Sequence, residues 1–107
     1  MNRNSLLPLT ETTYYIMLVL QEPAHGYLIM QKVEEMSLGD VRIAAGTLYG
    51  AIENLLKLQL IERMEDGDNR RKVYVLTEKG REILGQDAKR MNHMTSLLKG
   101  SDDNEEI

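Results

Sequence analysis

The stretch RRKVYVLTEKG, residues 70–80, decides how the rest of the sequence is interpreted. It opens with the only run of three basic residues in the chain, Arg70 to Lys72. The apolar, β-branched and aromatic residues that follow predict a short strand over 72–76. Thr77 then stands where a helix would begin, because its hydroxyl can accept a hydrogen bond from a backbone N–H of the first turn. A basic strand that leads directly into a helix is therefore predicted.

The residues on both sides of this stretch extend the pattern. A second strand is predicted over 61–65, and the residues DGDN at 66–69 are typical of a hairpin turn. After Thr77 a long helix is predicted over 78–99, about 33 Å long at 1.5 Å per residue. Its apolar residues recur at alternating spacings of four and three, which gives the helix one apolar stripe that is too long for a small monomer to cover.

Three helices are predicted before the hairpin. The first begins after Thr10, a suitable N-cap, and ends before Pro23; periodicity alone does not separate it from a buried strand, but the cap favours a helix. The second covers 25–36 and closes at Gly39, which suits a left-handed C-cap. The third covers 44–58. Three helices, a two-stranded hairpin and a long helix predict a mainly α fold with a small β-hairpin, a winged helix-turn-helix followed by a dimerisation helix.

Composition limits the possible functions. The 107 residues contain no Cys and carry a net charge of −4. Four of the acidic residues lie in the last six positions, so the body of the chain is neutral and its end is acidic. We expect no enzyme activity, no metal site and no cofactor, because no nucleophile with an adjacent base, ligand cluster or glycine-rich phosphate loop is visible. With neither a signal peptide nor a membrane-spanning stretch in the sequence, a cytoplasmic protein with no membrane partner is expected.

These patterns divide the chain into four parts. Residues 1–8 are expected to be disordered, 9–77 to form the winged helix-turn-helix domain, 78–99 to form the dimerisation helix, and 100–107 to form a disordered acidic tail.

The third predicted helix has an unusually small outer face. Gly46 and Gly50 would let its backbone approach DNA closely, and Asn54 could read adenine in the major groove. The basic run beside the hairpin is placed to contact phosphates.

The residues resemble the PadR family of transcriptional regulators. The resemblance covers roughly residues 9–99 and rests on the sequence HGY at 25–27, GTLY at 46–49, Leu60-Ile61, and above all the stretch 70–80. The single long terminal helix resembles the short form of the family, in which this helix dimerises with its partner. The resemblance implies a sequence-specific DNA-binding regulator, expected to act as a repressor and as a homodimer on an inverted repeat of duplex DNA. In some members the dimer interface holds a flat apolar cavity for aromatic compounds, so a small apolar or aromatic effector at that interface is among the expected partners.

Two sets of site residues are predicted from these arguments together. The DNA-binding set is Tyr27, Gly46, Thr47, Tyr49, Gly50, Asn54, Lys57, Arg70, Arg71 and Lys72. The dimer-interface set is Tyr14, Met17, Leu84, Ala88, Met91, Met94 and Leu98.

Some interpretations stay open on sequence alone. His25 either contacts phosphate or caps the helix and packs against its neighbours. The hydroxyls of Tyr27 and Tyr49 either bind phosphates or remain hydrated while the rings pack. Glu53 stands where basic residues are common in the family, and with the neutral body it favours a second function, a winged-helix module that binds protein and not DNA.

Overall fold

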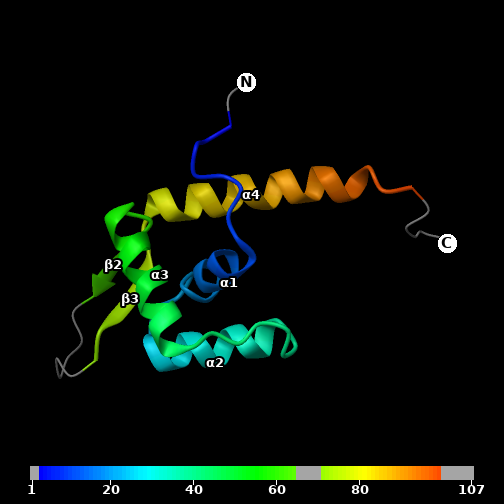
Figure 1. Ribbon diagram of the computed structural model, residues 1–107. Coiled ribbons are helices and arrows are strands. Elements are labelled where there is room, and N and C mark those ends of the chain that lie inside the picture. The colour runs from blue at the N-terminus through cyan, green and yellow to red at the C-terminus, as the bar shows by residue number, and fades with distance from the viewer. Residues whose placement is uncertain (1–2, 65–70, 100–107) are drawn as a thin grey trace.

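The structure is a computed structural model that describes residues 3–64 and 71–99. Within that part the chain is mainly helical, with one small antiparallel sheet, so the predicted fold class is confirmed (Figure 1). In chain order the elements are α1 (Glu11–Val19), β1 (Ala24–His25), α2 (Gly26–Met36), α3 (Ala45–Lys57), β2 (Ile61–Met64), β3 (Val73–Leu76) and α4 (Glu78–Ser96).

The helices begin where the capping residues predict. Thr10 accepts a hydrogen bond from the Thr13 N–H at 3.1 Å, and Thr77 accepts one from the Gly80 N–H at 3.0 Å. Ala44 caps α3 without any side-chain hydrogen bond, as its lack of a polar group requires. Gly39 has φ +84°, the left-handed conformation that the sequence predicts after α2.

The sheet has three strands in the order β1-β3-β2, one more than the hairpin that the sequence predicts. The register of the hairpin runs from Ile61 opposite Leu76 to Met64 opposite Val73. The additional strand, β1, is only two residues long and pairs antiparallel with β3 on its other side. The predicted turn at 66–69 lies outside the described residues.

The core lies where α1, α2 and α3 meet the sheet, and Ile16, Ile29 and Leu48 are fully buried in it. Two residues of the predicted dimer interface also belong to this core, because Met17 is fully buried and Leu84 is 7% exposed. Both side chains pack inside one protomer, so the predicted interface is corrected by removing them. Hydrophobic periodicity marks a covered face but does not say which neighbour covers it.

The segment before α1 packs against the rest of the chain. Leu6, Leu7 and Leu9 are partly buried against the core, and the Leu9 N–H donates to the carboxylate of Asp87 in α4 at 3.3 Å. Disorder was expected up to residue 8, and the packing of Leu6 and Leu7 differs from that expectation. The sequence alone could not show that α4 offers this segment a buried acceptor.

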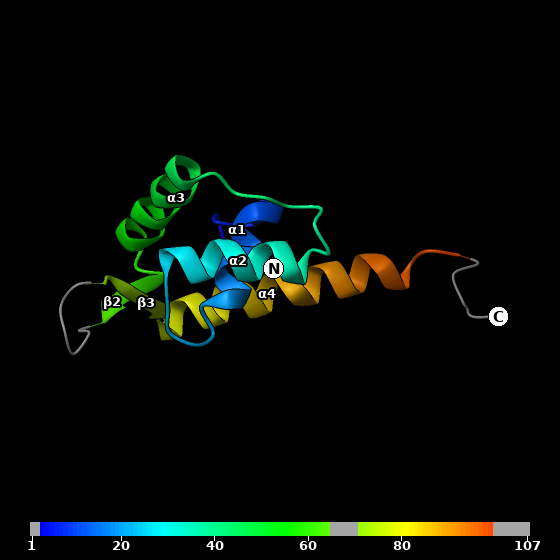
Figure 2. The same cartoon turned by 90° about the horizontal axis from the view of Figure 1, so that it is seen from below.

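Helix α4 is packed on the body of the molecule only in its first half. Its buried residues are Gly80, Ile83, Leu84 and Asp87, and no described residue after Asp87 is buried. In both views the second half extends past the other helices, while α3 and the hairpin lie near the N-terminal end of α4 (Figures 1 and 2). Over the described residues, no helix is both long and apolar enough to span a bilayer.

Candidate nucleic-acid interface

The outer face of α3 is exposed and contains two glycines, Gly46 and Gly50. Its inner face buries Leu48, Ile52 and Leu55. On the outer face a Cβ added to Gly46 or Gly50 would meet nothing within 4 Å. The hydrogen-bonding residues predicted to contact DNA from this helix are also exposed, namely Thr47, Asn54 and Lys57. Such a face fits the major groove, which admits a helix and presents base edges to polar side chains.

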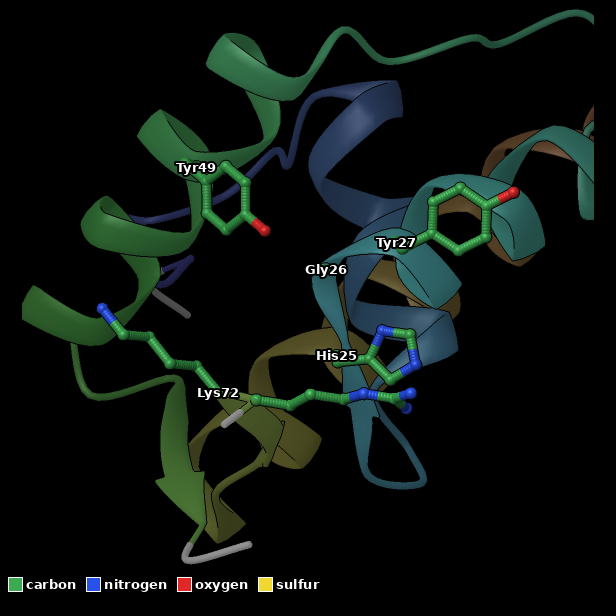
Figure 3. Close-up of a pocket in the computed structure, with 6 residues that line it drawn as sticks. His25, Gly26, Tyr27, Tyr49 and Lys72 are labelled. Carbon is green, nitrogen blue, oxygen red and sulfur yellow. The ribbon is translucent and has the colours of Figure 1, made fainter. Parts of the chain in front are cut away.

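A pocket of about 560 Å³ lies beside this helix and joins three parts of the chain (Figure 3). The first turn of α2 supplies one wall, α3 supplies Tyr49, and the residues just before β3 supply two cations. Figure 3 shows the Lys72 side chain extending toward α3 from the sheet. The residues that line the pocket are His25, Gly26, Tyr27, Tyr49, Arg71 and Lys72.

Gly26 and Tyr49 set the spacing between α2 and α3. An added Cβ on Gly26 would lie 2.9 Å from Cζ of Tyr49 and closer still to its hydroxyl. Gly26 therefore lets the Tyr49 ring approach the first turn of α2, while the ring stays 49% exposed. Tyr27, at 69% exposed, leaves its hydroxyl accessible from solvent.

His25 has a structural role at the start of α2. Its Nδ1 accepts a hydrogen bond from the Leu28 N–H at 3.4 Å, which makes it the N-cap of the helix. This supports the capping interpretation that the sequence left open. The ring also lines the pocket, so capping does not remove it from the site.

Tyr74 is a residue of this region that sequence reasoning missed. It lies on β3 opposite Arg63 of β2 and is only 4% exposed. Burial raises the pKa of the Tyr74 hydroxyl above its ordinary value, the nearby Arg63 cation opposes that rise, and Tyr49 adds to it. Alternation along the strand predicts an inward side chain here, but not that its environment reaches Tyr49 of α3.

The structure brings the DNA-binding set together as two adjoining groups, the outer face of α3 and the pocket beside it. Nine of its ten residues are described, and all nine are exposed. Arg70 lies outside the described residues.

The remaining residues of the predicted dimer interface lie on α1, on α4 and, for Leu98, just after the end of α4. Tyr14, Ala88 and Met91 are half-buried, and Met94 and Leu98 are 48% and 67% exposed. Tyr14 and Met91 also line a second cavity, of about 410 Å³, together with Leu9, Glu11, Tyr15, Leu18 and Asp87.

The sequence profile of the Transcriptional regulator PadR-like family matches residues 16–86, more than half of the chain. A curated relative, an uncharacterized 37.1 kDa protein in transposon TN4556 of Streptomyces fradiae, is 34% identical over 76 residues. That alignment covers 71% of this chain and 21% of the relative, so the chain spans about one fifth of that protein's length.

Two solved structures show the same fold. A PadR-like transcription factor from Bacteroides fragilis is 33% identical, with a TM-score of 0.65 over 78% of this chain and 82% of that one. ZitR of Lactococcus lactis, solved in complex with DNA, is 21% identical, with a TM-score of 0.63 over 90% of this chain and 62% of that one. At this lower identity ZitR supports the fold alone.

Proposed function

Because the chain belongs to the PadR-like family of transcriptional regulators, we propose that it binds duplex DNA sequence-specifically and represses transcription as a homodimer on an inverted-repeat operator. One observation carries the proposal. The small, exposed outer face of α3 adjoins a pocket that Arg71 and Lys72 line, so a groove-reading surface and phosphate-binding cations lie side by side. ZitR, which shares the fold at 21% identity, was solved in complex with DNA, so this fold is compatible with DNA binding.

Each part of this surface has a distinct task in the proposal. Asn54 reads a base edge, and Gly46 and Gly50 let α3 enter the groove. Arg71 and Lys72 bind phosphate without reading sequence, together with the hydroxyls of the pocket. In a dimer, two α3 helices about 34 Å apart would enter successive major grooves on one face of the duplex.

The second cavity supports a role for a small effector. Its volume of about 410 Å³ falls in the range that binds small ligands, and Tyr14, Leu18 and Met91 give it apolar walls. We propose that an apolar or aromatic compound bound there, at the dimer interface, changes DNA affinity.

A regulator of this kind works where the genome lies, which in a bacterial cell is the cytoplasm.

The proposal is tested by selecting duplexes from a random library with the wild-type protein and measuring their affinity. We expect an inverted repeat to be enriched. The Gly50→Leu variant should fold normally, since space around Gly50 is open, but should lose binding because the side chain blocks the groove. Gly50→Ala is the matched control. It adds only one carbon, so it should lose little affinity for DNA. Normal affinity of Gly50→Leu would show that this face does not approach DNA.

Glu53 favours the second function, a winged-helix module that binds protein. It is exposed on α3 next to Asn54, where a carboxylate repels phosphate. The same selection separates the two functions, because a protein-binding module would enrich no duplex. Replacing Glu53 with Gln would then leave the absence of DNA binding unchanged, whereas in a DNA-binding protein it should tighten binding to all sequences.

A further inference from the structure

The first turn of α4 forms hydrogen bonds to the C-terminal ends of two other helices. Thr77 donates its hydroxyl to the Gln59 carbonyl at 2.7 Å, and Lys79 donates its ammonium to the Leu58 carbonyl at 3.0 Å. Both carbonyls lie in the turn that follows α3. Arg81, two residues after Lys79, donates to the Gln21 carbonyl after α1 at 3.2 Å.

Backbone contacts also join the start of α4 to the turn after α3. The Thr77 N–H donates to the Leu60 carbonyl at 3.1 Å, and Gly80 is packed so closely that an added Cβ would collide with that carbonyl. Gln59 has φ +61°, a left-handed conformation that non-glycine residues seldom adopt, and it turns the chain back toward α4. Helix α3 is therefore held to α4 at its end, through a turn of fixed shape.

We propose that this contact, formed by Thr77, Lys79 and Gly80 against residues 58–60, is the junction that sets the angle between α3 and α4. Thr77, Lys79 and Gly80 are then positioning residues, which set the spacing between operator half-sites that the dimer prefers. The inference rests on the proposed function, in which α4 forms the dimer and α3 enters DNA. In such a dimer the separation of the two α3 helices depends on the angle at each junction, because α4 is fixed at the dimer axis.

The Thr77→Asp variant isolates the junction from helix capping. Aspartate is as good an N-cap as threonine, so the bond from the Gly80 N–H is kept. A carboxylate cannot donate to the Gln59 carbonyl, however, and it places a negative charge beside that oxygen. Thr10→Asp, at the N-cap of α1, is the matched control, because it adds the same charge to a cap away from the junction. Thr77→Ser keeps both the donor and the cap, so it should behave as wild type.

The angle is measured without DNA, by spin labels on Glu53→Cys in α3 and Gln86→Cys in α4. Both positions are exposed, and the chain has no other cysteine. Dilution with unlabelled protein restricts the signal to pairs within one chain. We expect one narrow distance distribution in wild type, Thr77→Ser and Thr10→Asp, and a broadened or shifted one in Thr77→Asp.

The second readout is affinity for one half-site and for inverted repeats lengthened or shortened by single base pairs. Thr77→Asp should bind a single half-site as wild type does, but its preference for the best spacing should fall about fivefold, the factor for one lost hydrogen bond. A wild-type distance distribution in folded Thr77→Asp would overturn the junction. If that variant does not fold, the same spin-label distances are measured in Lys79→Met. Its control is Lys89→Met, which replaces an exposed lysine of the same helix. Should wild type bind no duplex, the proposed function fails, while the distances still decide the junction.

Discussion

Arg71 and Lys72 line the same pocket as the first turn of α2, so the pocket contains two cations. The first turn of a helix has backbone N–H groups without intrahelical partners and a partial positive charge. Two side-chain cations in the same pocket add to that field, although the chain as a whole is acidic. A phosphate would meet attraction from both sources in this pocket, so local geometry outweighs net charge.

Replacing either of these two cations should weaken phosphate binding. Arg71→Ala and Lys72→Ala should each weaken binding to every duplex by a similar factor, because phosphate contacts carry no sequence information. Each should also reduce the slope of log affinity against log salt by about one. Titrations at several salt concentrations measure both effects. Lys32→Ala removes an exposed cation of α2 outside this pocket and should change neither. A loss confined to one duplex sequence would contradict the assignment.

The second residue-scale prediction follows from Tyr74. Because burial raises the pKa of its hydroxyl in the folded protein, the unfolded chain ionises first as pH rises above the ordinary value of 10.0. The stability that the neutral hydroxyl contributes is therefore complete below pH 10.0 and is lost as pH approaches the folded pKa. Denaturant unfolding between about pH 8 and about pH 11 should show a steeper alkaline loss in wild type than in Tyr74→Phe. Tyr27→Phe, which changes a 69% exposed side chain, should follow wild type.

At the scale of elements, α4 contains two glycines that have opposite surroundings. An added Cβ on Gly80 would collide with the backbone carbonyl of Leu60, which cannot move without disturbing the turn after α3. An added Cβ on Gly85 would meet nothing within 4 Å. Gly80 is therefore needed for a close approach between two elements, while Gly85 only costs α4 the higher conformational entropy of glycine.

The two glycines predict stability changes of opposite sign. Gly80→Ala should lower the free energy of unfolding by about 3 kcal/mol, as overpacking against a rigid neighbour does. Gly85→Ala should raise it by about 0.5–1 kcal/mol, because alanine is the better helix former. Urea unfolding followed by circular dichroism measures both. A neutral Gly80→Ala would mean that the turn after α3 is not held against α4.

Elements were predictable from sequence wherever one local signal defines them. The caps at Thr10 and Thr77 and the left-handed Gly39 depend on neighbours within a few residues, and each was found as predicted. Strand β1 was missed because two residues give no alternation to detect, and it exists only through its pairing with β3. The buried carboxylate of Asp87 has a local partner in Arg90, at 2.6 Å, but its bond to the Leu9 N–H joins residues 78 positions apart, and no local pattern predicts that contact.

The same distinction holds for the candidate site. The exposed face of α3 followed from helical spacing, but the pocket required α2, α3 and β3 to be placed in three dimensions. The interface residues divide in the same way. Periodicity identified Leu84 and Met91 as one stripe, yet α4 buries Leu84 in its own protomer and leaves Met91 at the edge. Which part of an apolar stripe remains for a partner is a property of the tertiary packing.

At the scale of the whole molecule, the second half of α4 projects from a body that does not cover it (Figure 2). The last apolar side chains of α4 and of the residues just after it, Met94, Leu97 and Leu98, are between 48% and 67% exposed. Apolar side chains concentrated along one exposed helix are typical of an interface between protein chains. A second copy that packs along α4 would cover them and would bring two α3 helices into one assembly, as the proposed operator requires.

The final prediction tests that assembly with one charge. Met91→Glu places a carboxylate in the proposed apolar interface, and we expect it to weaken the dimer by about 2 kcal/mol or more, because a charge buried without a partner loses its hydration. Dimerisation and operator affinity should fall together while the helix content of the protomer is retained. Sedimentation equilibrium, duplex titration and circular dichroism measure the three quantities.

The matched control for that variant is Gln86→Glu, which adds the same charge five residues earlier, about 140° around the helix. Gln86 is exposed and stands apart from the apolar stripe, so the dimer should be as stable as in wild type. Equal weakening by both variants would point to the charge of α4 as a whole and not to its stripe. A wild-type protein that sediments as a monomer at micromolar concentration, yet binds an inverted repeat tightly, would overturn the assembly, because one α3 helix covers too few base pairs to select an operator.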